Sequence, residues 1–205
     1  MTETPEISIY EKTFAKSDKT DAILVVDGKK LHVNKAVLSY HSDYFQALFN
    51  SDFKEKSMEE IEINDVKFED FATLLSQIQN NPITPEVKNI TILLELADRF
   101  LLPAAKRHLE LFVISPGLST IEKIELADKF ELGSLLKHTL KSYKHFQPTQ
   151  EFSNFSDNTK ARIFDRQIEL HREIENRQFA FPPYGYHRRA FRQGGDEEID
   201  EDEVW

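Results

Sequence analysis

The sequence contains no cysteine among its 205 residues. This absence excludes disulfide bonds, cysteine-based zinc sites and thiol catalysis, and it is typical of proteins in a reducing compartment. Residues 1–30 contain no uninterrupted apolar stretch of the kind found in signal peptides. No run of the sequence approaches the roughly 20 apolar residues of a membrane span. We therefore expect a soluble intracellular protein, cytoplasmic or nuclear or both.

Motifs that carry catalytic or metal chemistry are also missing. The seven histidines form no His-x-x-x-His or His-x-His pair beside a carboxylate, so their spacing does not indicate zinc. The six glycines include no phosphate-binding loop, and no serine stands in a nucleophile elbow. We expect no catalytic residue, metal or cofactor, and hence no enzyme.

The charge of the chain is concentrated at one end. The formal net charge is -10, and seven acids with no base fall in residues 194–205. These seven acids account for most of the excess, so that the rest of the chain carries only -3. A nearly neutral body argues against a nucleic-acid coat or a binder of anionic membranes, both of which favour positive charge.

The N-terminal part of the chain predicts a β-hairpin followed by a helix. Residues 22–26 are an apolar, β-branched run of strand length, and residues 31–33 form the returning strand. Asp27-Gly28 between them is a dipeptide typical of tight hairpin turns. Asn34 is a favourable N-cap, and the apolar spacing behind it predicts one amphipathic helix over 35–49.

Three flanking segments complete this α/β part. Residues 7–14 hold only four large apolar side chains and are compatible with a short strand or with one helical turn. Residues 60–65 alternate polar and apolar, which predicts a short half-buried strand. Apolar residues over 68–78 form a helical face, and Asn80-Asn81-Pro82 ends it.

The middle of the chain contains an internal repeat. The sequence ELADRF at 95–100 recurs as ELADKF at 125–130, thirty residues later. The first copy ends a predicted helix over 86–100, and each copy is followed by a second helix, at 103–113 and 134–146. A helix pair repeated at this period predicts two helical hairpins, stacked on the preceding α/β part.

The C-terminal part has a different composition. Residues 156–177 allow one more helix, whereas residues 179–205 show no period and are expected to be disordered. Aromatic and arginine side chains interleave in this tail, at Tyr184, Tyr186, Arg188 and Arg189. Such a composition stacks on single-stranded nucleic acid or forms a peptide motif for a protein groove.

Several spaced motifs resemble a known family. They are Asp21-Ala22-x-Leu24-x-Val26-x-Gly28, Leu31-x-Val33-x-Lys35, Ser42-x-Tyr44-Phe45-x-x-Leu48-Phe49, Ile61-Glu62-Ile63-Asn64-Asp65-Val66 and Leu94-x-x-Ala97-Asp98-x-Phe100. Together they resemble the BTB/POZ domain over about residues 20–115. The resemblance is closest to the BTB half of MATH–BTB ubiquitin-ligase adaptors. The MATH β-sandwich has no room before residue 20, and we expect it to be absent.

The resemblance implies a fold and a division of the chain. The implied fold class is α+β, with a helical bundle flanked by a small sheet and followed by an α-helical extension. The implied parts are an N-terminal segment at 1–19 with a possible dimer contact, the BTB/POZ domain at 20–115, a helical-hairpin extension at 116–146, a further helix at 147–178 and the tail at 179–205.

The resemblance also implies partners and contact residues. BTB domains of this kind dimerise with themselves or with another BTB protein, and a subset bind a cullin-3 type scaffold that ubiquitinates a substrate protein. The implied cullin contacts are Phe49, Phe53 and Glu55, the last two within Phe53-Lys54-Glu55. The implied dimer contacts are Asp21, Lys35, Tyr10 and Phe14.

Departures from the family pattern leave alternatives open. Asn34 stands where the family often has histidine, and Gln79 stands where it has an aromatic residue. Phe53 can also pack against its own domain with Glu55 in solvent. The chain would then be an oligomerisation scaffold or heterodimer partner that recruits no ligase. A third alternative is a nucleic-acid-associated protein that acts through residues 184–192.

Overall fold

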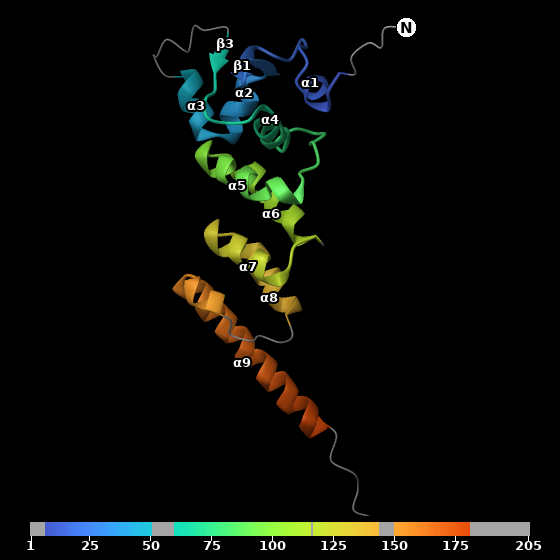
Figure 1. Ribbon diagram of the computed structural model, residues 1–205, viewed down its shortest axis with the longest axis vertical. Helices are drawn as coiled ribbons and strands as arrows, with labels where there is room; N and C mark the ends of the chain where they lie inside the picture. Colours follow the sequence, from blue (N-terminus) through green and yellow to red (C-terminus); the bar gives the residue numbers. More distant parts are fainter. Residues whose placement is uncertain (1–6, 51–59, 116, 144–149, 181–205) are drawn as a thin grey trace, which may run out of the picture. The chain divides into compact units, whose positions relative to one another are not determined.

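The chain folds as a small sheet beside a helical bundle, followed by further helices (Figure 1). The computed structural model describes residues 7–50, 60–115, 117–143 and 150–180. Two units divide the chain, residues 1–166 and 167–205. The first unit contains the sheet and most helices, which is the α+β arrangement that the sequence predicts. In the part of the chain that the structure describes, no helix is long and apolar enough to cross a membrane.

The sheet has three strands in the order β2-β1-β3. Strands β1 (Ala22–Val26) and β2 (Lys29–Val33) are antiparallel, and β3 (Glu60–Glu62) pairs with β1 in parallel. Asp27 and Gly28 in the hairpin turn have positive φ values of 48° and 72°, as the dipeptide predicts. Alternate side chains of the strands are buried against the helices.

The segment before the sheet forms a helical turn, α1 (Ile9–Thr13). Ser8 and Glu11 form a capping box at its start, because each side chain accepts the other residue's backbone N–H. The carbonyl of Phe14 then accepts the N–H of His32 at 3.1 Å, on the outer edge of β2. This bond ties the N-terminal segment to the sheet.

The single helix predicted over 35–49 is wrong, because the structure has two helices. They are α2 (Lys35–His41) and α3 (Asp43–Asn50), separated by Ser42 in extended conformation. The Ser42 hydroxyl accepts the N–H of Phe45 at 3.1 Å, so it caps α3. The apolar spacing continues across the break, and it therefore conceals the change of direction.

Helix α4 (Phe68–Ser76) ends two residues before the predicted limit at residue 78. The side chains of Ser76 and Gln77 are buried and bind the backbone of Ile83. Ser76 Oγ accepts its N–H at 2.9 Å, and Gln77 Nε2 donates to its carbonyl at 2.9 Å. This polar junction fixes the chain reversal that leads to the next helix.

The repeat forms two helical hairpins, as predicted. The first consists of α5 (Ile90–Arg99), preceded by the short helix η2 (Val87–Asn89), and α6 (Pro103–Ile114). The second consists of α7 (Thr120–Lys129) and α8 (Gly133–Ser142). Figure 1 shows the second hairpin below the first in the same unit. The repeat therefore extends the bundle by one further layer.

The two hairpins turn in the same way. Leu101 and Glu131, thirty residues apart, both have positive φ, at 48° and 55°. In each turn the following leucine donates its N–H back to an alanine carbonyl, Leu102 to Ala97 at 2.8 Å and Leu132 to Ala127 at 2.9 Å. The repeated sequence thus encodes a repeated left-handed helix end.

A final helix, α9 (Asp157–Ala180), follows the short helix η3 (Gln150–Asn154). Its predicted limits were 156–177. Asp128 in α7 accepts the backbone N–H of Ser156 at 3.0 Å, directly before α9 begins. Hydrogen bonds from Ser156 and Thr159 offset the burial of the Asp128 carboxyl, and its pKa is lowered. This carboxylate anchors the start of α9 to the second hairpin.

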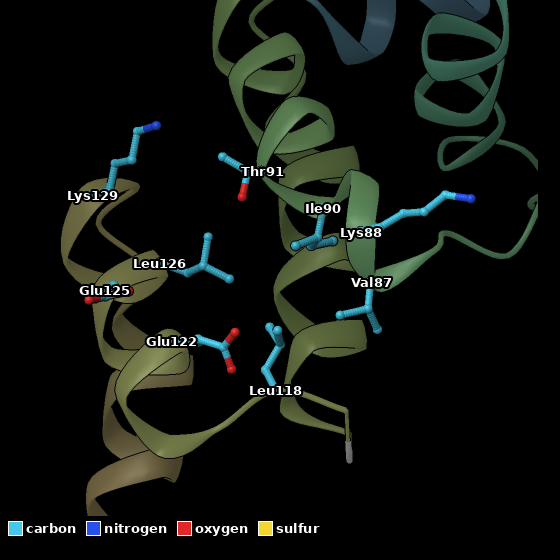
Figure 2. Close-up of a pocket in the computed structure, with 9 residues that line it drawn as sticks. All are labelled: Val87, Lys88, Ile90, Thr91, Leu118, Glu122, Glu125, Leu126 and Lys129. Atoms are coloured by element: carbon cyan, nitrogen blue, oxygen red, sulfur yellow. The ribbon is translucent and has the colours of Figure 1, made fainter.

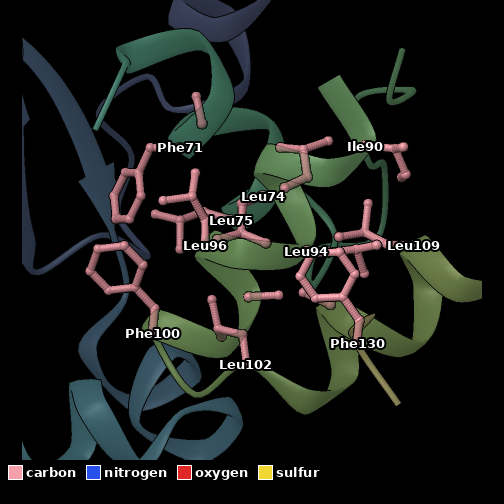
Figure 3. Close-up of a cluster of buried hydrophobic side chains, with 14 of the residues drawn as sticks. Phe71, Leu74, Leu75, Ile90, Leu94, Leu96, Phe100, Leu102, Leu109 and Phe130 are labelled. Carbon is pink, nitrogen blue, oxygen red and sulfur yellow. The ribbon is translucent and has the colours of Figure 1, made fainter. Parts of the chain in front are cut away.

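The core runs from the sheet through both hairpins. Figure 3 shows buried side chains of α4, α5 and the second hairpin in one continuous cluster. At the sheet end, the ring of Phe100 packs edge-on against Phe71 with centroids 4.9 Å apart and stacks on Phe45 at 6.0 Å. Aromatic packing of this kind stabilises beyond its buried area. The end of α5 is therefore central to the domain.

Candidate interaction surfaces

The structure brings Asp21 and Lys35 together through the backbone. Asp21 Oδ1 accepts the N–H of Lys35 at 2.7 Å, at the first residue of α2. The Lys35 ammonium instead lies 5.7 Å from the centre of the Phe49 ring. Asn34 Oδ1 accepts the N–H of Val37 at 2.9 Å, as expected of an N-cap. These bonds fix where α2 begins and which face it exposes.

Helix α2 exposes an apolar pair that the sequence did not reveal as surface. Val37 is 43% exposed and Tyr40 is 84% exposed. They lie three residues apart and therefore on the same side of the helix. Val37 belongs to the apolar spacing that predicts the helix over 35–49, so its exposure differs from what that spacing indicates. We name Val37 and Tyr40 the α2 face; Asp21 and Lys35 lie at the start of the same helix. Exposed apolar side chains of this size mark candidate protein contacts.

Two of the implied contact residues are core residues instead. Phe14 is 2% exposed and Phe49 is 6% exposed, so each ring packs inside its own protomer. Phe49 stacks on Phe45 with centroids 5.8 Å apart. Tyr10 is half-buried, with its ring edge-on to Phe68. Of these three, only Tyr10 keeps surface for a partner.

Other implied contacts lie outside the described residues. They are Phe53 and Glu55, between α3 and β3, and Tyr184, Tyr186, Arg188 and Arg189 in the tail. The structure places Asn50 and Glu60 on either side of the first group, at the end of α3 and the start of β3.

A buried carboxyl stands beside a pocket between α4 and α5. Asp70 in α4 is 7% exposed, and burial raises its pKa while the nearby Lys67 opposes that shift. The pocket, about 290 Å³, is also lined by Arg99, which donates to the carbonyls of Asn64 and Asp65 at 3.0 and 3.1 Å. Asp70 falls within the predicted apolar helix, and the periodicity gave no signal of its burial.

A buried acid joins the two hairpins. Glu110 in α6 is 6% exposed, and one of its oxygens accepts the N–H groups of Ser134 and Leu135 at 2.7 and 2.8 Å. The other oxygen pairs with Arg107. Burial alone would raise the pKa of Glu110, but these bonds outweigh it and the pKa is lowered. The carboxylate thereby caps α8 from the neighbouring helix.

A groove of about 410 Å³ lies between the first helix of each hairpin. Figure 2 shows Ile90, Leu118 and Leu126 lining it, with Glu122 and Lys129 among the charged groups around it. Such a groove is suited to an apolar side chain of a partner, with charged groups nearby to orient it. Within the described ranges, no group of three or more His, Asp or Glu residues is placed to hold a metal ion.

A family model matches a large part of the chain. The model of the BTB/POZ domain matches residues 10–116, which run from within α1 through the sheet and the first hairpin. A solved structure of the BTB domain of human gigaxonin aligns with 55% of this chain and 99% of its own, at 22% identity and a TM-score of 0.41.

Curated relatives carry the same domain in longer chains. BTB and MATH domain-containing protein 38 of Caenorhabditis elegans is 34% identical over 170 residues, which are 78% of this chain and 43% of the relative. BTB and MATH domain-containing protein 36 of the same organism is 37% identical over 58% of this chain and 38% of its own length. The chain spans about two fifths of the length of these relatives.

Proposed function

This chain belongs to the BTB/POZ domain family, and from that premise we propose that it dimerises and acts as an adaptor for a cullin-3 type ubiquitin ligase. Domains of this family bind other proteins, and protein binding is the general function of this domain. The finer role concerns two surfaces, the α2 face and the segment after α3.

The α2 face supports the proposal of a dimer. Val37 and Tyr40 expose apolar area on a helix whose start is fixed by Asp21. A two-fold dimer uses the same patch on both protomers, so an exposed apolar patch on one protomer can pack against its own copy on the other. Charged groups at the start of the helix, including Lys35, would set the orientation of the two protomers. We propose Tyr10 as a further contact, because it is half-buried in the neighbouring α1.

The sequence after α3 supports the proposal of cullin recruitment. Phe53-Lys54-Glu55 has the hydrophobic-x-Glu pattern of the adaptors that the chain resembles. The names of the relatives place their BTB domains in MATH-containing proteins. An aromatic ring that enters a partner pocket beside an orienting carboxylate is the usual composition of a binding hot spot. A substrate would be captured by residues 147–205 or by the other protomer of a mixed dimer.

The test is a binding measurement between the full chain and a cullin-3 N-terminal domain. Phe53→Ala and Glu55→Lys should each weaken binding by about 30-fold, the loss of about 2 kcal/mol typical of a hot-spot residue. Lys54→Ala, between them, is the matched control and should bind like the wild type. Unchanged binding by both variants would refute the cullin proposal.

Light scattering separates this proposal from its main alternative. A dimer at tens of micromolar without cullin binding would identify the chain as an oligomerisation module that forms mixed dimers with longer BTB proteins. A strict monomer at that concentration would contradict both.

A further inference from the structure

A second groove, of about 600 Å³, lies on the N-terminal side of the fold. Three parts of the chain form its walls. They are the end of α1 with the segment that follows it (12–20), the end of β2 with the start of α2 (32–38), and the end of α4 with the segment that follows it (75–81). We call it the N-terminal groove. It is distinct from the groove between the hairpins, with which it shares no lining residue.

The charged groups of the N-terminal groove are all of one sign. Lys12 and Lys19 line it, and among the residues that the structure describes no acid does, although acids are 36 of the 205 residues. Both lysines are exposed, and neither has an ion pair with any of the residues that the structure describes. The nearest acid in sequence to Lys12, Glu11, is committed to the capping box of α1. Asp18 is exposed but does not line the groove.

The rest of the lining is suited to an extended chain. Buried apolar side chains of Phe14, Val33 and Leu38 lie at its base. The exposed amides of Asn80 and Asn81 stand on one wall. Amide groups both donate and accept hydrogen bonds, so they can bind the main chain of a peptide while the base takes an occasional apolar side chain.

We propose that the N-terminal groove binds an acidic, extended peptide segment of a partner protein. Charge complementarity carries the assignment, because two lysines with no ion pair to the described residues meet the carboxylates of the peptide. The amides hold its backbone. Peptide binding at this groove is separate from dimerisation and from ligase recruitment. It does not require the whole α2 face, and it does not require Phe53 or Glu55. Val37 is the one residue that the groove and the α2 face share.

Fluorescence anisotropy with the full chain tests the proposal. The probe is a labelled peptide with the sequence of residues 194–205, added in trans, and the control peptide carries amides in place of its seven acids. The acidic peptide should bind and the amide peptide should not. Lys12→Gln combined with Lys19→Gln should weaken binding at least fivefold, and raising the salt concentration should weaken it further.

A matched variant and a tail variant decide between outcomes. Lys137→Gln with Lys141→Gln removes the same charge from exposed sites on α8 and should leave the affinity unchanged. Equal binding by both lysine pairs would overturn the proposal. The proposal would also be overturned if the peptide bound only to a chain whose own seven tail acids are replaced by amides. The tail of the wild-type chain would then be the occupant of the groove. Light scattering must show an unchanged oligomeric state in Lys12→Gln/Lys19→Gln, since an altered state would assign the groove to a second copy.

Discussion

The hydroxyl of Ser42 donates a 2.6 Å hydrogen bond to the carbonyl of Phe100, 58 residues later in the chain. The same hydroxyl caps α3, so one side chain fixes both the break between α2 and α3 and the end of α5. Ser42→Ala should lower the free energy of unfolding by about 1–3 kcal/mol, because a buried carbonyl loses its partner. Urea denaturation measures this change. Ser39→Ala, in the adjacent helix, should cost much less, and equal losses would contradict the assigned role.

The α2 face predicts how the dimer can be broken. Val37→Asp with Tyr40→Asp places two charges where we propose apolar contact, so the chain should become monomeric in light scattering at tens of micromolar. Its thermal unfolding midpoint should change little beyond the loss of the dimer, because both side chains are exposed. Ile92→Asp, a 40% exposed residue on α5, is the control and should stay dimeric. A dimeric α2 variant would exclude this face.

Burial of Asp70 predicts that the free energy of unfolding depends on pH. Its folded-state pKa is raised from the ordinary value of 3.8, so the ionised carboxyl opposes folding, and stability from this group is lost as pH rises through the raised pKa. Asp70→Asn should therefore stabilise the protein at pH 7 and have little effect near pH 3, where both states of Asp70 are protonated. Urea denaturation at both pH values measures the difference. A stabilisation that does not depend on pH would show that the carboxyl charge is irrelevant.

Glu110 should behave in the opposite way. Its folded-state pKa is lowered, so the stability it contributes is present above its ordinary value of 4.5 and is lost as pH falls through the lowered pKa. Glu110→Ala removes the acceptor of two α8 amides and should cost about 2–4 kcal/mol at pH 7. Glu125→Ala, an exposed acid in α7, should cost less than about 0.5 kcal/mol. Equal costs would contradict the capping role of Glu110.

The left-handed turn at Glu131 predicts a stabilising substitution. Its φ of 55° is unfavourable for a side chain with a Cβ atom, and glycine adopts it freely. Glu131→Gly should raise the free energy of unfolding by about 0.5–1 kcal/mol, measurable as a higher thermal midpoint. The same change at Glu125, inside α7, should lower it by about 1 kcal/mol. Destabilisation at residue 131 would show that its side chain contributes more than its conformation costs.

Local sequence patterns predicted most helices and strands, but they did not predict which individual side chains are buried. The Asp27-Gly28 turn, the β-hairpin and the repeated hairpins follow from short-range chemistry that the sequence displays directly. The break at Ser42 did not follow, because the apolar spacing runs through it unchanged, whereas the break is marked by the cap on Phe45 and by the distant carbonyl of Phe100. No periodicity within residues 35–49 carries that information.

In the candidate sites too, local patterns did not predict which side chains are exposed. The resemblance to the BTB/POZ family implies that Phe14 and Phe49 contact partner proteins, yet both rings are buried in the core. Val37 shares the helical spacing of the core residues and is nevertheless exposed. Exposure is a property of packing between elements, and the sequence alone could not assign it.

The contacts between successive layers point back along the chain, and this has a consequence for assembly. Arg99 binds carbonyls of residues 64 and 65, Lys129 binds Glu95 at 2.8 Å, and Ser156 binds Asp128. Each new layer therefore finds its partner groups on residues that were synthesised earlier. A ribosome that delivers the chain from the N-terminus releases the second hairpin and the start of α9 after the residues that they contact, so these later layers can dock as they emerge.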